Sequence, residues 1–264
     1  MSYVTHGYQL HDAIEVLLGD LKKWGQTVDP GHWQGVSTEG HPEMVTREIL
    51  DAKFTAPIPV AQQALVEAVK PNMPWAEDEF QERVGGEPHN PHRSMQHWPW
   101  WRGQIDDKMS HTYSERFWPS VYEGDEGTNY FHTGIRYRFG DLQDVINLLK
   151  DQPHTRQATF PIFFPEDTGA VHGGRIPCTL HYHFLLRKNH LHLWYAIRSC
   201  DAVRHFRDDI YMAGRLMQWV LEQLWLQTDE DSSRDDFSWL DVHPGTLYFT
   251  AYSFHVHRAD EHLL

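Results

Sequence analysis

Two strand-like segments followed by a long apolar helix are the feature that most constrains the fold of this chain. The segments 179–186 and 190–197 flank a short polar turn, so they are predicted to form a β-hairpin. The stretch 210–228 is apolar on nearly every side and carries two tryptophans, which is typical of a helix buried in the centre of a domain. A sheet packed against a buried helix is therefore predicted for this half of the chain.

The remaining segments add helices and strands in mixed order. Helical periodicity is found at 8–24, 60–69, 75–84 and 141–150, and strand-like segments are found at 48–54, 158–164 and 246–256. This mixture, without an internal repeat, predicts an α+β fold in a single domain spanning residues 1–264. The segment 87–127 is rich in Pro, His, Trp and charge without a sustained period, and it is interpreted as a candidate insertion.

Composition and charge exclude several classes of function. The formal charge of −14 at pH 7 argues against binding of a nucleic-acid polymer, which requires a basic surface. No apolar run approaches the roughly 18 residues that cross a bilayer, and no signal-peptide pattern is present, so a cytoplasmic protein with no membrane partner is expected. Cys178 and Cys200 are the only cysteines, too few for a disulfide framework.

A compact block of reactive side chains lies in the C-terminal half. The segments I-P-C-T-L-H-Y-H-F and I-R-S-C-D-A-V-R-H-F-R-D-D contain Cys178, Arg198, Ser199, Asp201 and Asp209. A thiolate can act as a covalent nucleophile, and an arginine can bind a phosphate through two parallel hydrogen bonds. Carboxylates can transfer protons. This combination predicts a covalent active site for a phosphorylated substrate.

The order of motifs around this block resembles the thymidylate synthase family. The chain reads L-K-D-Q-P-H-T-R, then P-C, R-S-C-D, F-R-D-D and H-x-H, where the family has a phosphate loop, P-C-H, Q-R-S-x-D, an asparagine and H-x-Y. The resemblance covers residues 137–257, and several ordered motifs carry it together. It implies a thymidylate-synthase-like fold with a large mixed β-sheet packed by helices, and a homodimer. It also implies a pyrimidine nucleotide as substrate and 5,10-methylene-tetrahydrofolate as co-substrate.

The resemblance assigns catalytic roles to three residues. Cys178 is the expected nucleophile that adds to C6 of the pyrimidine, whereas Cys200 is expected to be a packing residue. Asp201 matches the carboxylate that orders water and the folate ring. Upstream, E-F-Q-E-R-V-G-G resembles the glutamate helix of the family. Glu79 is therefore the expected acid-base group, with Glu82 as the alternative one turn further on.

Phosphate binding is expected from three residues. Arg198 and Ser199 match the phosphate-binding pair of the family. Arg156 matches the first arginine of the phosphate loop, which in the family reaches into the site of the partner subunit. Gln157 stands where the family usually has a second arginine, so the phosphate contacts are expected to differ there.

Sugar binding and the site tyrosine are expected from two further motifs. His255 matches the sugar-binding histidine of the family, and His257 stands where a tyrosine would hold the 3′-hydroxyl. Tyr137 in G-I-R-Y-R lies where the family has its site tyrosine. Only seven residues follow His257, so nucleotide binding is expected more strongly than closure over folate.

Two departures from the family indicate a cytosine substrate. Asp209 replaces the asparagine that reads uracil, and an aspartate can accept from the cytosine amine and, when protonated, donate to N3. The C-T and F-R-D-D motifs resemble those of phage-type deoxycytidylate hydroxymethylases. The expected reaction is therefore conversion of dCMP or CMP to the 5-hydroxymethyl nucleotide, and Ser199, the deoxynucleotide-type residue, favours dCMP.

Three alternatives remain open. One is a uridylate-specific enzyme, either a thymidylate synthase or a dUMP hydroxymethylase, and another is a non-catalytic nucleotide-binding protein of the same fold. The third is a metal site on the hairpin. His181 and His183 are expected on one face of the first strand, and His190 and His192 on one face of the second. No carboxylate shares this spacing, so no metal is expected.

Overall fold

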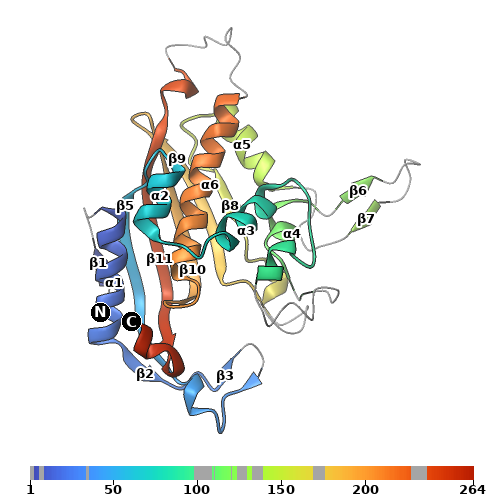
Figure 1. Ribbon diagram of the computed structural model, residues 1–264. Helices are drawn as coiled ribbons and strands as arrows, with labels where there is room; N and C mark the ends of the chain where they lie inside the picture. Colours follow the sequence, from blue (N-terminus) through green and yellow to red (C-terminus); the bar gives the residue numbers. More distant parts are fainter. Residues whose placement is uncertain are drawn as a thin grey trace.

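One mixed β-sheet forms the centre of the molecule (Figure 1). The structure, a computed structural model, describes residues 3–5, 9–33, 36–97, 109, 111–119, 121–123, 130–132, 139–168, 176–226 and 237–264. The seven strands of the sheet are β1 (Tyr3–Thr5), β2 (Gln26–Val28), β5 (Thr46–Pro57), β8 (Thr159–Pro161), β9 (Thr179–Arg187), β10 (His190–Asp201) and β11 (His243–His257).

The strand order is β1-β5-β11-β10-β9-β8, and β2 also pairs with β5. The β1/β5 and β10/β11 pairs are parallel, and the other pairs are antiparallel. Two short hairpins lie outside the sheet, formed by β3 (His32–Trp33) with β4 (Val36–Ser37) and by β6 (Val121–Glu123) with β7 (Tyr130–His132). The predicted hairpin of residues 179–197 is the β9/β10 pair.

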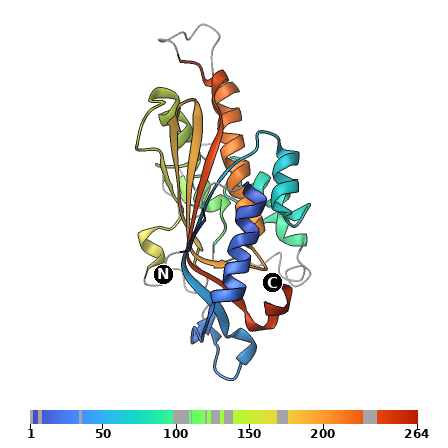
Figure 2. The same ribbon diagram turned by 90° about the vertical axis from the view of Figure 1, so that its left-hand side faces the viewer.

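Helices cover one face of this sheet. The helices are α1 (Leu10–Trp24), α2 (Gln62–Val69), α3 (Trp75–Val84), α4 (Ser114–Phe117), α5 (Leu142–Asp151) and α6 (Phe206–Leu226). Five 3₁₀ turns complete the described elements: η1 (Pro42–Met44), η2 (Arg93–His97), η3 (Pro165–Asp167), η4 (Trp239–Asp241) and η5 (Arg258–Leu263). Figure 2 views the sheet from its edge and shows α1, α2, α3 and α6 on the same side of it. None of the described helices is long and apolar enough to cross a membrane.

The long apolar helix predicted at 210–228 is α6, and it packs directly on the sheet. Phe206 begins the helix and contacts three buried rings of the sheet, with ring centroids 6.4 Å from Phe54, 5.5 Å from Phe249 and 4.8 Å from Phe254. Further along α6, a Cβ added at Gly214 would lie 2.9 Å from the Leu65 side chain, so α2 packs closely against this part of the helix. Burial of this aromatic layer stabilises the α6–sheet interface.

The remaining predicted elements are found close to their expected bounds, with one exception. The strand expected at 158–164 extends only over β8, because the chain after Pro161 turns into η3. The segment 87–127, interpreted as an insertion, is described in part, and those parts pack on the core. Phe117 of α4 lies with its ring centroid 4.9 Å from Phe160 and 6.3 Å from Tyr182.

Regular strand pairing is interrupted at one level across the centre of the sheet. Arg198 and Tyr252 are skipped in the β10/β11 pairing, and Tyr252 and Asp51 are skipped in the β11/β5 pairing. Asp51 has a φ of 57°, in the left-handed region, and the β9/β10 register shifts between Ala196 and Ile197. The β9/β10 shift has the one-residue offset of a β-bulge, which changes the direction of the side chains that follow it, whereas the register of the β10/β11 and β11/β5 pairs is the same on both sides of the skipped residues.

The interruption turns polar side chains out of the core. Before it, Phe249 and Ala251 are the buried residues of β11; after it, Phe254 and Val256 are buried, so the alternation has moved by one residue. The neighbouring strand changes in the same way, because Cys200 is buried while residues 199 and 201 keep exposed surface. At the ends of these strands Asp201 and His255 keep some exposed surface, whereas His257 is buried.

Candidate active site

Cys178 and Arg198 lie side by side at the start of the β9/β10 pair. Cys178 occupies a bend before β9, and its carbonyl accepts the Arg198 amide at 2.8 Å. The Arg198 guanidinium donates from Nε to the Pro177 carbonyl at 2.9 Å, and from Nη2 to the Ile176 carbonyl at 3.1 Å and to Cys178 Sγ at 4.0 Å. Nη1 has no partner among the described residues, so two of its hydrogens can bind an anion. An arginine beside a thiol favours the thiolate.

Tyr113 completes this end of the site. Its hydroxyl oxygen accepts the Thr179 amide at 3.4 Å and the Thr179 hydroxyl at 3.3 Å, which places it next to the residue that follows Cys178. Burial, and then the charge of the Cys178 thiolate, raise the pKa of Tyr113, so the hydroxyl keeps its proton. Sequence reasoning selected Tyr137 for this position, and Tyr137 lies outside the described residues. Tyr113 was missed because it follows a segment without periodicity.

Arg83 connects Tyr113 to the glutamate helix. Both Arg83 and Glu79 are buried in α3, and Arg83 Nε lies 2.8 Å from Glu79 Oε1. The Arg83 guanidinium carbon lies 3.9 Å from the centroid of the Tyr113 ring, a cation–π geometry. The signal available in the sequence was the four-residue spacing of Glu79 and Arg83, which brings both to one helix face.

Glu79 is ionised and fully engaged. Its Oε2 atom accepts from Ser94 Oγ at 2.5 Å and lies 2.8 Å from His92 Nδ1. Burial alone would raise the pKa of Glu79, but the charges of His92 and Arg83 and the hydrogen bonds of His92 and Ser94 lower it to about 2. The expectation that Glu79 transfers protons stays a prediction, and in the free protein this carboxylate positions Arg83.

Glu82, the alternative acid-base group, points elsewhere. Its two carboxylate oxygens accept the amide hydrogens of Arg93 at 2.7 Å and Ser94 at 3.0 Å, at the start of η2. These bonds satisfy amides that a short helical turn leaves without partners. Of the two glutamates, Glu79 is therefore the one linked to Arg83 and Tyr113.

Asp209 lies in the first turn of α6 and has a strongly shifted pKa. Its amide donates to the His205 carbonyl at 2.8 Å. Protein atoms surround its carboxyl group, although the residue keeps some exposed surface, and this burial raises the pKa of Asp209 to about 7. The charge of Arg83 opposes the shift, whereas those of Asp208, Asp201 and Glu79 add to it. At neutral pH the Asp209 carboxyl is therefore a mixture of the donor and acceptor forms.

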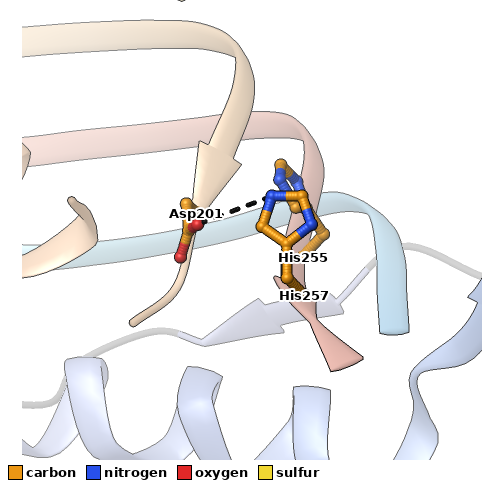
Figure 3. A group of neighbouring side chains, drawn as sticks. All are labelled: Asp201, His255 and His257. Carbon is orange, nitrogen blue, oxygen red and sulfur yellow. Dashed lines mark ion pairs between the residues drawn. The ribbon is translucent and has the colours of Figure 1, made fainter. Parts of the chain in front are cut away.

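Asp201, His255 and His257 form a second group at the ends of β10 and β11 (Figure 3). Asp201 and His255 are direct neighbours in the parallel register of these strands. Asp201 Oδ2 lies 3.9 Å from His257 Nε2, and one ligand atom from each of the three residues lies within 4.8 Å of the others. Burial lowers the pKa of His255, so its imidazole is neutral at pH 7.

The residues predicted from the sequence block converge on Cys200. Burial raises the pKa of this thiol, and the charges of Asp209, Asp201 and Cys178 raise it further. Cys200 itself is buried in the core, as its predicted packing role requires. Ser199, one residue earlier, is partly exposed and pairs in register with Ser253 of β11.

Arg156 is the exception, since it lies far from Cys178 in its own chain. It is exposed between α5 and β8, two residues before Ala158, whose carbonyl accepts the Phe184 amide at 2.9 Å. Phe184 is six residues beyond Cys178 along β9, which corresponds to roughly 20 Å at the rise of an extended strand. Arg156 therefore cannot bind a phosphate at the Cys178 of its own subunit.

The hairpin histidines do not form a metal centre. His183 Nδ1 lies 2.7 Å from Thr159 Oγ1, His190 Nδ1 lies 2.7 Å from the Lys188 carbonyl, and His192 Nδ1 accepts the Thr246 amide at 3.1 Å. These residues are not among the groups of three or more ligand atoms that the described part of the chain brings together.

Comparison with known proteins establishes the fold. No protein-family model matches this chain, and no curated protein sequence matches it. Among solved structures, thermostable thymidylate synthase A from Bacillus subtilis matches with a TM-score of 0.63, covering 96% of this chain and 81% of that chain at 14% sequence identity. The chain therefore has a thymidylate-synthase-like fold, and the predicted α+β class with a mixed sheet packed by helices is confirmed.

Proposed function

We propose that this protein is a pyrimidine nucleotide C5 hydroxymethyltransferase that converts dCMP to 5-hydroxymethyl-dCMP. The observation that carries the proposal is the carboxyl of Asp209, whose pKa is raised to about 7, in the same cluster as the Cys178 thiol. A carboxyl that is partly protonated at neutral pH can donate to N3 of cytosine and accept from its amine. Uracil presents the opposite pattern at these positions.

The reaction begins with the Cys178 thiolate adding to C6 of the cytosine. This addition makes C5 nucleophilic, and C5 takes a one-carbon unit from 5,10-methylene-tetrahydrofolate, the co-substrate. Loss of the C5 proton, with departure of tetrahydrofolate, leaves an exocyclic methylene group on the nucleotide. Water adds to that carbon, the C6–sulfur bond breaks, and the 5-hydroxymethyl nucleotide is released with the thiolate restored.

Other residues of the site bind and orient the nucleotide. Nη1 of Arg198 and the hydroxyl of Ser199 are assigned to the phosphate, and the assignment of Nη1 is supported by the contacts of Nε and Nη2 with backbone carbonyls. His255 and His257 are assigned to the sugar. Asp201 is assigned to the water and folate side of the pyrimidine ring. Glu79 joins proton transfer when the bound substrate displaces one of its present partners.

The product itself tests the proposed reaction. The protein is incubated separately with dCMP, CMP and dUMP, each with 5,10-methylene-tetrahydrofolate, and the nucleotides are analysed by mass spectrometry. We expect the mass of a hydroxymethyl group to be added to dCMP. A methyl or hydroxymethyl gain on dUMP alone would instead identify the uridylate-specific alternative, and binding without any product would identify the non-catalytic one.

A second copy of the chain is proposed to complete each site. Figure 2 shows α1, α2, α3 and α6 on one side of the sheet, and none of these four helices covers its other side. That face carries half-buried aromatic side chains, including Trp194 and Tyr248, which stack with ring centroids 4.1 Å apart. An aromatic sheet face of this kind is typical of an interface. The distance of Arg156 from its own Cys178 supports its donation to the partner subunit.

Mixing two inactive variants tests this shared site. Cys178→Ala and Arg156→Ala are each expected to be inactive, because one lacks the nucleophile and the other lacks a phosphate contact. After the two are unfolded together and refolded, mixed dimers contain one intact site, and we expect about a quarter of the wild-type activity to return. A mixture with no activity above that of the separate variants would contradict donation across the interface.

A further inference from the structure

The group formed by Asp201, His255 and His257 has the composition of a metal site. It contains two imidazoles and one carboxylate, a ligand set found in both zinc and non-haem iron centres. Figure 3 shows both rings on β11 turned toward Asp201 at the end of β10. The nearest measured pair, Asp201 Oδ2 and His257 Nε2, is separated by 3.9 Å. Ligands bound about 2.1 Å from a common ion are separated by at most about 4.2 Å, so small side-chain rotations suffice.

The hydrogen bonds around His255 fix which ring nitrogen carries the proton. The Ser253 hydroxyl donates its single hydrogen to Glu48, so its oxygen accepts from His255 Nδ1, which lies 3.2 Å away. Nδ1 therefore carries a proton, and Nε2 is the ring nitrogen that a metal ion could bind. This chain of carboxylate, hydroxyl and imidazole is the arrangement that orients histidine ligands in metal centres.

His257 is oriented in the same way by the backbone. Its Nδ1 atom lies 3.3 Å from the Met44 carbonyl, which can only accept, so Nδ1 is again the protonated nitrogen. Nε2 faces the Asp201 carboxylate, with Oδ2 at 3.9 Å. The other Asp201 oxygen, Oδ1, accepts the amides of Val203 at 3.0 Å and Arg204 at 2.9 Å, which hold the carboxylate in place.

We propose that Asp201, His255 and His257 bind one divalent transition-metal ion of the class of Zn²⁺. One donor atom of each residue lies within 4.8 Å of the others, and the hydrogen bonds of His255 to Ser253 and of His257 to Met44 hold the two rings in that arrangement. Three protein ligands leave at least one coordination position for water or a hydroxyl group of a ligand. The proposed function assigns these side chains to the sugar and to water, and an ion held by them would meet the same groups at its open position; metal binding is therefore measured without nucleotide.

Neighbouring charges separate this group from the other candidate cluster. Glu79, Glu82 and His92 also bring ligand atoms within 4.8 Å, but a guanidinium already compensates Glu79, and backbone amides occupy Glu82. Near Asp201, the Arg204 guanidinium lies 3.9 Å away but is bound more closely by Asp260, at 2.7 Å. Arg204 therefore forms its close ion pair with Asp260 and not with Asp201.

Metal titration of the purified protein tests the site. Protein without a histidine tag is treated with a chelator, and Zn²⁺ affinity is measured by competition with a chromophoric chelator. We expect one Zn²⁺ per chain to bind more tightly than all others, and Asp201→Asn or His257→Gln to remove that site. Ser253→Ala keeps all three ligands and is expected to weaken it by about 10- to 100-fold, through loss of ligand orientation.

Matched controls separate this site from binding by the other histidines. His183→Gln removes a histidine of β9 that is not part of this group, and it is expected to retain the tight site. Co²⁺ bound in place of Zn²⁺ is expected to give ligand-field absorption without a thiolate-to-cobalt charge-transfer band. Equal affinity in wild type, Asp201→Asn and His257→Gln would overturn the proposal, as would loss of the site in His183→Gln or a thiolate band from a cysteine ligand.

Discussion

Replacement of Cys178 by alanine is expected to abolish both hydroxymethylation of dCMP and exchange of its C5 hydrogen with solvent. Both processes need C5 to become nucleophilic, and in the proposed mechanism only addition of sulfur at C6 produces that change. Removal of a covalent nucleophile lowers kcat by on the order of 10⁴- to 10⁶-fold in comparable enzymes. Exchange is measured by nuclear magnetic resonance with dCMP deuterated at C5.

Cys200→Ala is the matched control for this experiment. Its thiol is buried, and burial with the nearby charges raises its pKa, so it is neither accessible nor ionised. We expect Cys200→Ala to retain exchange and product formation. Nucleotide binding to Cys178→Ala should persist, since Arg198 keeps its backbone contacts. Exchange that continued in Cys178→Ala would refute the covalent mechanism.

Asp209→Asn is expected to change the base preference from cytidylate to uridylate. Asparagine can donate to O4 and accept from N3–H of uracil, whereas the partly protonated aspartate matches cytosine. Sites that hydrogen-bond a substrate group reject analogues with the wrong pattern by about 10⁴-fold, so the ratio of kcat/KM for dCMP and dUMP should change by at least about 10³-fold. A variant that kept the wild-type ratio would remove Asp209 from base recognition.

The same variant is also expected to change how stability depends on pH. The pKa of Asp209 is raised from 3.8 to about 7, so between these values the folded protein binds a proton that the unfolded chain releases. The free energy of unfolding contributed by this group is therefore highest below pH 4 and falls as the pH rises to 7. A shift of about three units corresponds to at most about 4 kcal/mol.

Urea unfolding at pH 5 and pH 8 measures this effect. Asp209→Asn lacks the titrating group, so its stability relative to wild type should be greater at pH 8 than at pH 5. Asp144 is an exposed carboxylate in the first turn of α5, and Asp144→Asn is the control substitution. If the free energies of unfolding of wild type and Asp209→Asn changed equally between pH 5 and pH 8, folding would not raise the pKa of Asp209.

Local patterns were sufficient for most of the secondary structure. The helix predicted at 141–150 begins as α5 one residue later, because Asp141 caps it by accepting the Asp144 amide at 2.8 Å. The helix predicted at 75–84 coincides with α3. Such elements follow from capping and periodicity within a few residues. The strand at 158–164 was overestimated because its end depends on where η3 packs, which is not local information.

Interactions between distant segments explain what was missed in the site. Tyr113 joins the site through Thr179, which is 66 residues away in the sequence. His255 and Asp201 become neighbours only through the parallel register of β10 and β11. A single sequence contains no reliable signal for strand register or for the position of a bulge.

The sequence by itself determined the α+β class and the set of reactive side chains around Cys178, because periodicity and short spacings encode both. Only the tertiary structure decided the chemical state of those side chains. Asp209 is an ordinary aspartate in the sequence, and its raised pKa results from burial and from the charges of Asp208, Asp201 and Glu79. The grouping of Asp201 with the two β11 histidines likewise depends on strand pairing. Protonation and coordination depend on distances through space, and folding alone sets those distances.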